Sequence, residues 1–293
     1  MAMFPVWIDT DIGDDIDDAV ALLCALRHPD IDVVGISTVF RRVEARVWLA
    51  REILERAGAS RVLVLPGAMA SFDGRRDERN DIPAQAQLAP PLEPVSPEQD
   101  DARIRTIAQA MVALPERFHL LTIGPLTNAA RLIDRHPGIV ERWVSVTCMA
   151  GQLEQGVEYN IQCDPAATRV VFERLAPRVV GIEACRDVLT RQEAEAALDP
   201  GNPASAFLLD CYRLYREQPR WHADPETAPL TLFDAISLLS LLREDLFGFQ
   251  DLRIFVEKDG RLRLTDDGAP VRYTVSSDWG AIKPIITGLL RGS

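Results

Sequence analysis

The sequence contains very little lysine: among its 32 basic residues, only Lys258 and Lys283 are lysines. The 44 acidic residues outnumber the basic ones and give a formal net charge of −12. Proteins that bind DNA or RNA neutralise backbone phosphates with basic surfaces, which this balance does not favour. We therefore expect no nucleic acid partner.

Long apolar runs and patterned cysteines are also absent. No apolar run approaches the roughly 18 residues of a membrane-spanning helix, so we expect no membrane partner. Residues 1–5 carry no basic segment of the kind that begins a signal peptide. The five cysteines are odd in number and widely spaced, without a metal-ligand or disulfide pattern. This cysteine usage favours a reduced, cytoplasmic compartment.

The pattern that is present alternates strand-like and helix-like segments through most of the 293 residues. Strands are expected at 4–8, 31–39, 61–65, 118–123, 143–149 and 178–183, and helices at 42–57 and 206–215. This alternation predicts an α/β fold with a Rossmann-like, mostly parallel open sheet flanked by helices. Residues 252–274 indicate a C-terminal β-hairpin. No linker divides the chain, so we expect a single domain over residues 1–293.

An unusually acidic segment follows the first expected strand. It reads Asp9-Thr10-Asp11-Ile12-Gly13-Asp14-Asp15-Ile16-Asp17-Asp18 and leads into an apolar helix that Asp17 or Asp18 is suited to cap. Open α/β sheets bind ligands at the carboxyl ends of their strands. Because the six carboxylates repel one another, a hard divalent cation with oxygen ligands would supply the missing counter-charge. The alternative is a solvated acidic turn with a good helix cap.

Four further segments place polar groups at strand ends or helix starts. They are Leu120–Asn128 (LLTIGPLTN), Met149–Gln152 (MAGQ), Glu158-Tyr159-Asn160 followed by Asp164-Pro165-Ala166-Ala167, and Asp234 at the head of an apolar helix. With the acidic segment, in this order, they resemble the inosine-uridine nucleoside hydrolase family over nearly the whole chain. The resemblance implies a Rossmann-like domain, a tightly bound Ca²⁺ and hydrolysis of an N-ribosidic bond.

The resemblance also implies roles for individual residues. Asp11 and Asp18 would ligate Ca²⁺ together with the backbone carbonyl of Ile123 and the side chain of Asp234. Asp11 or Asp17 would take the proton from the water that the metal activates. Oxygen ligands of this kind suit Ca²⁺, which binds six to eight of them.

Further positions would hold the substrate, a small-molecule nucleoside or other N-riboside. By the same resemblance, Asp17, Glu158 and Asn160 would bind ribose hydroxyls, and Asp9 would orient the acidic segment from behind. Carboxylates around the sugar would also stabilise the oxocarbenium-like charge that develops as the bond breaks. Family members are commonly homodimers or homotetramers, so a homo-oligomer is expected.

The acidic segment departs from the family pattern DxDPGxDDA. Ile12 replaces the proline, and two additional residues are present. We align Asp17-Asp18 with the family's adjacent pair because both pairs run directly into the helix. Asp14-Asp15 is the alternative ligating pair.

A second departure follows the second strand, where Arg41-Arg42 stands in place of the Gly-Asn of many members. These arginines are interpreted either as the solvated first turn of a helix or as a site for an anionic substrate group.

A third departure concerns protonation of the leaving base. Purine-active members carry a histidine immediately before the late aspartate, but this chain has Phe233, which cannot transfer a proton. Candidates to replace it are His222, Tyr212 and Tyr215, unless they only pack in the interior or at the surface. The missing histidine favours a pyrimidine nucleoside or another N-riboside over a purine nucleoside.

Two rival functions remain at this stage. The chain is also similar, through Asp9-Thr10-Asp11, to haloacid-dehalogenase-like phosphohydrolases, but these need a mid-chain lysine, and Lys258 and Lys283 come late in the sequence. The second rival is a Ca²⁺-loaded sugar or nucleoside binder that has lost turnover.

Overall fold

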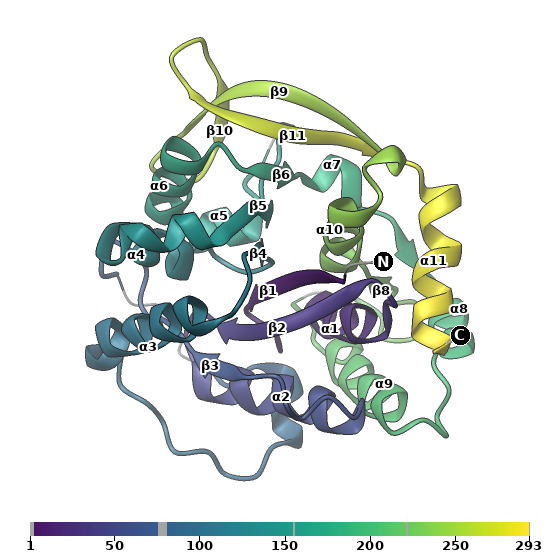
Figure 1. Ribbon diagram of the computed structural model, residues 1–293. Helices are drawn as coiled ribbons and strands as arrows, with labels where there is room; N and C mark the ends of the chain where they lie inside the picture. The colour runs from purple at the N-terminus through teal and green to yellow at the C-terminus, as the bar shows by residue number, and fades with distance from the viewer. Residues whose placement is uncertain (1–2, 76–80, 155, 221, 293) are drawn as a thin grey trace.

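A largely parallel sheet forms the centre of the computed structural model (Figure 1), which describes residues 3–75, 81–154, 156–220 and 222–292. Within these residues the sheet has nine strands in the order β10-β9-β11-β6-β5-β4-β1-β2-β3. Their bounds are β1 Phe4–Thr10, β2 Ile31–Thr38, β3 Val64–Pro66, β4 Phe118–Thr122, β5 Trp143–Met149, β6 Arg178–Val180, β9 Phe247–Val256, β10 Leu262–Leu264 and β11 Ala269–Ser277. A small antiparallel pair joins β7 (Val188–Leu189) to β8 (Leu230–Thr231).

Helices cover both faces of the sheet. They are α1 Asp17–Arg27, α2 Val43–Arg56, α3 Asp100–Ala113, α4 Thr127–Arg135, α5 Tyr159–Cys163, α6 Pro165–Leu175, α7 Ile182–Cys185, α8 Arg191–Ala197, α9 Pro203–Arg216, α10 Phe233–Leu242 and α11 Trp279–Arg291, with short 3₁₀ turns that include η1 (Ala84–Leu88). In the described part of the chain, no helix is both long and apolar enough to cross a membrane.

Two buried clusters hold the helices against the sheet. Val6 and Ile8 of β1 pack into one cluster with α1, α2, α9, α10 and α11. Trp7, between them in sequence, points to the opposite face and packs with α3, α4 and α6. Alternate residues of a strand face opposite sides, so a short apolar run that is buried on both sides supports two helical layers. These layers lie on either side of the sheet in Figure 1.

The expected α/β fold with a mostly parallel sheet is confirmed, and three of its details are corrected. The strand expected at 61–65 begins only at Val64, because its pairing with β2 covers Val64–Pro66. The strand expected at 178–183 ends at Val180, because its pairing with β5 and β11 covers only Arg178–Val180, and α7 follows. The C-terminal hairpin is part of a three-stranded antiparallel unit. Its middle strand, β9, pairs with β10 on one side and with β11 on the other.

The chain reverses its direction of travel across the sheet between β1 and β4. β1 pairs in parallel with β2 on one side and with β4 on the other. Successive connections therefore leave this point toward opposite edges, which opens a crevice at the carboxyl ends of the strands. The acidic loop (residues 11–18) follows β1 at this crevice, and Ile123 follows β4.

The helix cap expected from Asp17 or Asp18 is wrong. Ile16 occupies the N-cap position of α1, and it makes no side-chain capping bond. Asp17 and Asp18 instead form the first helical turn and are buried. The positive end of the helix dipole favours negative charge in this first turn, which helps to stabilise the two buried carboxylates.

Candidate active site

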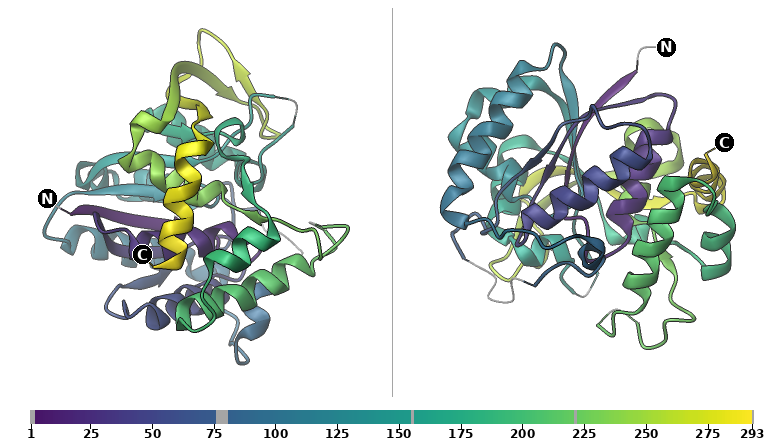
Figure 2. Two further views of the ribbon diagram at one scale, coloured as in Figure 1. Left: turned by 90° about the vertical axis from the view of Figure 1, so that its right-hand side faces the viewer. Right: turned by 90° about the horizontal axis from the view of Figure 1, so that it is seen from below.

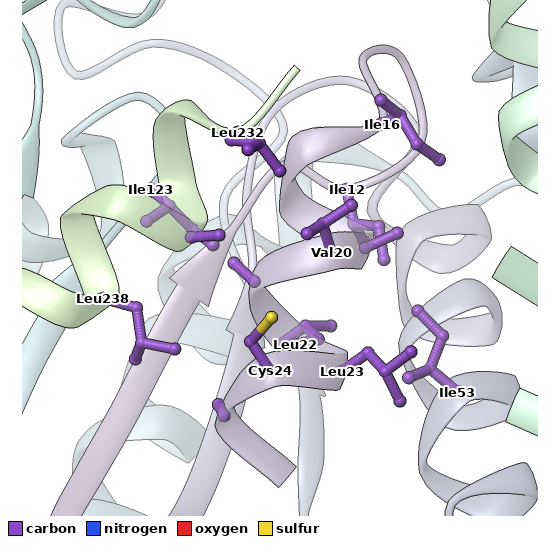
Figure 3. Packing of buried hydrophobic residues seen from close by; sticks show 14 of the residues in the cluster. Ile12, Ile16, Val20, Leu22, Leu23, Cys24, Ile53, Ile123, Leu232 and Leu238 are labelled. Carbon is purple, nitrogen blue, oxygen red and sulfur yellow. The ribbon is translucent and has the colours of Figure 1, made fainter. Parts of the chain in front are cut away.

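Buried isoleucines anchor the acidic loop to the core. Ile12 and Ile16 are fully buried and pack with Val20, Leu232 and the neighbouring apolar residues (Figure 3). Ile12 stands where the family pattern has proline. Its packing into the core, rather than a proline ring, fixes the loop at this point. Because the apolar residues point inward, the acidic residues between them line the crevice.

The carboxylates of this loop are buried, so the interpretation as a solvated acidic turn is wrong. Asp11, Asp14, Asp17 and Asp18 are at most 7% exposed. Asp17, Asp18 and Asp234 each offer an oxygen within 4.8 Å of the others, an arrangement that suits a metal ion. Asp234 joins them from the first turn of α10. The resemblance predicted Asp18 and Asp234 as ligands, whereas Asp17 was predicted to contact ribose.

A cavity of about 160 Å³ opens over this cluster. Its lining consists of Asp11, Asp14, Asp15, Asp17, Asp18, Ile123, Met149, Glu158, Tyr159, Asn160, Ile182, Phe233 and Asp234. The fold therefore brings together eight of the predicted positions around one space: the four acids of the metal and catalytic set, Ile123, Glu158, Asn160 and the position of the missing histidine. The volume is below the roughly 300–1,000 Å³ of pockets for drug-sized ligands, so it suits a compact group.

Burial sets the protonation of the clustered acids. It raises the pKa of Asp17, Asp18 and Asp234 well above the ordinary aspartate value, and the neighbouring carboxylates raise these pKa values further. Burial also raises the pKa of Asp11 to about 7, against the opposing effect of Arg46. A cation bound among these carboxylates would stabilise their ionised forms and so lower their pKa values.

Glycine lets the end of β4 approach the acidic loop. A Cβ at Gly124 would lie 2.7 Å from Oδ1 of Asp11 and 2.9 Å from its backbone nitrogen. The Ile123-Gly124 segment can therefore pass directly beside Asp11. This contact places the Ile123 carbonyl and the acidic loop on the same cavity.

Asn160 and Glu158 stand at the start of α5. The Asn160 side-chain nitrogen donates to the carbonyls of Ile123 (3.2 Å) and Met149 (3.1 Å). Glu158 caps α5 by accepting from the backbone nitrogens of Asn160 (2.7 Å) and Ile161 (3.1 Å). Its carboxylate is buried, and burial raises its pKa. Both side chains line the cavity and also hold its backbone in place.

Asp9 precedes the acidic loop at the end of β1, and its side chain bonds to β2 and α4 rather than to the loop. Its carboxylate accepts hydrogen bonds from the hydroxyl of Ser37 and from the side-chain amide of Asn128 (2.7 Å). Asn128 also donates to the carbonyl of Thr38 (3.0 Å), so it joins β1 and β2. Thr10 donates its hydroxyl to Asp18 and so orients one acid of the cluster.

The three candidates for leaving-group protonation lie differently, and none lines the cavity. The Tyr212 hydroxyl donates to the carbonyl of Ala228 (2.7 Å), which is a structural contact. Tyr215 interacts with the carboxylate of Asp15, and its ring meets that of His222 edge-on, with centroids 4.5 Å apart. Within the described residues, Nε2 of His222 is buried without a hydrogen-bond partner.

Arg41 and Arg42 are not the solvated helical turn that was one of the two interpretations. Arg41 is 3% exposed and Arg42 is 9% exposed. Arg42 pairs with Glu44, while Arg41 and the preceding Phe40 adopt positive φ angles of 55° and 73°. Arg41 acts electrostatically on Tyr159, which lines the cavity.

Sequence reasoning missed Arg46, a fully buried arginine of α2. Its guanidinium donates to the carbonyls of Asp11, Ile12 (2.9 Å) and Phe40 (2.8 Å), and it pairs with Asp14 at 2.9 Å. Arg46 therefore braces the acidic loop from α2. The sequence did hold an indication that Arg46 is buried. It lies three residues before Leu49 and four before Ala50, so it shares the apolar face of the helix with them.

Comparison with known proteins now defines the family. Residues 6–279 match the sequence model described as "Inosine-uridine preferring nucleoside hydrolase". The chain belongs to this family. Among its relatives, "Probable uridine nucleosidase 1" of Oryza sativa subsp. japonica is 29% identical over 95% of this chain and 89% of that protein. "Pyrimidine-specific ribonucleoside hydrolase RihA" of Photobacterium profundum is 28% identical over 94% of both.

Solved structures of nucleoside hydrolases share the fold. A "Plant nucleoside hydrolase - PpNRh1 enzyme" superimposes with a TM-score of 0.81 at 22% identity, covering 99% of each chain. The inosine-uridine preferring nucleoside hydrolase from Bacillus anthracis gives a TM-score of 0.79 at 21% identity, covering 99% of this chain and 100% of the other. This nucleoside hydrolase therefore keeps the family's architecture over the whole chain.

Proposed function

We propose that this nucleoside hydrolase is a Ca²⁺-dependent enzyme that hydrolyses the N-glycosidic bond of pyrimidine ribonucleosides or related N-ribosides. The observation that carries the proposal is one cavity lined by the Asp17, Asp18 and Asp234 cluster together with Glu158 and Asn160. N-riboside hydrolysis follows from the family. The metal, the substrate class and the roles of the residues are our proposal.

The donor set of the cavity fits a hard cation. Asp11, Asp18 and Asp234 would hold the ion with the Ile123 carbonyl, and Asp17 lies within the same cluster. All are oxygen donors, and the described lining holds no cysteine or histidine. Its only sulfur is the Met149 thioether, so the donor set favours Ca²⁺ over softer metals. When bound, Ca²⁺ supplies the positive charge that lowers the pKa of the attacking water.

The residues of the chain then handle the proton and the sugar. Asp11 or Asp17 accepts the proton from the attacking water, because both carboxylates face the cavity where that water must lie. The side-chain nitrogen of Asn160 is bonded to backbone carbonyls, which leaves its amide oxygen for a ribose hydroxyl. The carboxylates of Asp17 and Glu158 stabilise the positive charge that develops on the ribosyl group.

Two observations support a pyrimidine or similar leaving group. Phe233 lines the cavity at the position of the purine-specific histidine and cannot protonate a base. The two relatives described above carry uridine and pyrimidine nucleosidase names. His222 is the candidate donor to the base: burial lowers its pKa, so at neutral pH its ring is uncharged and offers a single N–H.

A ribose-release screen tests this proposal. Purified protein is given uridine, cytidine, inosine and nicotinamide riboside, each with Ca²⁺ or with a chelator. We expect release from the pyrimidine ribosides that is lost with chelator and restored by added Ca²⁺. If the protein binds ribosides in the presence of Ca²⁺ but releases ribose from none, it is a binding protein and the proposed reaction is wrong.

A further inference from the structure

Asp14 does not belong to the metal cluster, although it lies in the acidic loop. Its Oδ2 pairs with Arg46 at 2.9 Å, and its Oδ1 pairs with Arg220 at 2.6 Å. Although burial acts in the opposite direction, these two guanidinium groups lower the pKa of Asp14. The carboxylate is therefore ionised and neutralised by arginine. Asp14 thus links Arg46 of α2 to Arg220, which lies 206 residues after Asp14 in the chain.

Asp15 makes a parallel set of contacts. Its Oδ1 accepts a hydrogen bond from the Thr231 hydroxyl at 2.6 Å, and its carboxylate interacts with Tyr215. The Tyr215 ring carries the contact onward to His222. Asp14 and Asp15 therefore reach three places: the end of α9, the connection after it and β8.

The connection between α9 and β8 (described at 217–220 and 222–229) also contacts α8 and α9. Figure 2 shows it in green as a long loop leading from α9. Within the described residues, its other side-chain bonds include Tyr212 to Ala228 and Arg216 to Pro225 (3.0 Å), both from α9, and an ion pair between Arg191 of α8 and Glu226. The pair between Asp14 and Arg220 ties it directly to the acidic loop.

We propose that Asp14 and Asp15, the two acids that the comparison with the family motif leaves over, are positioning residues rather than metal ligands. They attach the α9–β8 connection, with His222, to the acidic loop and thereby set how tightly the site holds its nucleoside. This inference rests on the proposed function, because it assigns the connection to the substrate side of the same cavity.

Arg220→Gln tests the inference, because Arg220 is partly exposed and lies outside the cavity lining. We expect its KM for uridine to rise about fivefold, while the dissociation constant for Ca²⁺ changes by less than twofold. Arg220→Lys should recover part of the loss. The matched control is Arg135→Gln, which removes an exposed pair with Asp134 at the end of α4 and should leave both constants unchanged.

Deuterium exchange, measured without substrate, separates this inference from the proposed function. Amides of the α9–β8 connection should exchange faster in Arg220→Gln than in wild type or Arg135→Gln. If wild type releases no ribose, only the proposed function fails, and the uridine dissociation constant replaces KM in the comparison. Unchanged exchange, or a loss of Ca²⁺ affinity without a change in uridine affinity, would overturn the positioning role.

Discussion

At the scale of single residues, Asp234 is central to the proposed metal site, because it brings a carboxylate from α10 to the acids that follow β1. We expect Asp234→Ala to abolish tight Ca²⁺ binding and to lower kcat by more than about 100-fold, which exceeds the usual cost of losing an outer contact to a metal ligand. Calorimetric Ca²⁺ titration and ribose release measure both effects.

The matched control is Asp266→Ala, which removes an exposed acid from the turn between β10 and β11 and should change neither quantity. Activity retained in Asp234→Ala would contradict the proposed metal site. Loss of Ca²⁺ binding with unchanged turnover would contradict the role of the metal in the reaction.

Phe233 offers a second residue-scale prediction, since it lines the cavity directly before Asp234. Phe233→His should raise the ratio of kcat/KM for inosine to that for uridine by at least about tenfold. A positioned general acid typically contributes 10²–10⁴-fold, and this variant places one where purine-active family members carry theirs. Steady-state kinetics on both nucleosides measure the ratio. Phe233→Leu, which adds no proton donor, should leave it unchanged; an equal rise in both variants would point to cavity size instead.

The sequence predicted which residues line the cavity better than it predicted the side-chain contacts that these residues make. Asp11, Asp18 and Ile123 lie at one edge of the sheet because they follow β1 and β4, parallel strands that end there together. Asp234 comes instead from α10, which follows no strand of this sheet, so only the family motif predicted its place. The sequence did not predict that Asp14 pairs with Arg220, since no local pattern links residues 206 positions apart. Tyr212 was a candidate for the same reason as Tyr215, but its hydroxyl is turned to Ala228.

At the scale of elements, α2 supports the acidic loop through Arg46. Arg46→Met should lower the free energy of unfolding by about 3–5 kcal/mol, because it leaves Asp14 and the backbone carbonyls of the loop without a buried partner. Urea denaturation measures the loss. Arg51→Met, an exposed position on the same helix, is the control and should cost less than about 1 kcal/mol.

Element types were predictable and element ends were less so. Apolar runs identified the parallel strands, because burial on both faces requires them. The end of β6 depends instead on how far β5 and β11 accompany it, which the sequence of β6 does not encode. The cap of α1 was mispredicted because Asp17 and Asp18 have favourable cap chemistry but face the cavity, and Ile16 packs into the core at the cap position.

At the scale of the whole molecule, the clustered acids would couple binding of the proposed metal to stability. In the metal-free fold, burial raises the pKa of Asp9 and Asp11 to about 7, and it raises those of Asp17, Asp18 and Asp234 as well. In the unfolded chain these groups titrate near 4. The folded protein therefore binds more protons than the unfolded chain between about pH 4 and 7, and the stability tied to these groups is lost as pH rises through that window.

The proposed Ca²⁺ would reverse this loss, because a bound cation stabilises the ionised carboxylates. We expect the Tm difference between Ca²⁺-loaded and chelator-treated protein to be at least about 5 °C larger at pH 8 than at pH 5. Because 1 kcal/mol shifts the Tm of a protein of this size by about 2–4 °C, this corresponds to about 2 kcal/mol of unfolding free energy. Differential scanning calorimetry at both pH values measures the difference. Asp234→Ala, which lacks one ligand, should show little widening. A difference that is equal at pH 5 and pH 8 in the wild type would mean that the ion binds away from these buried acids.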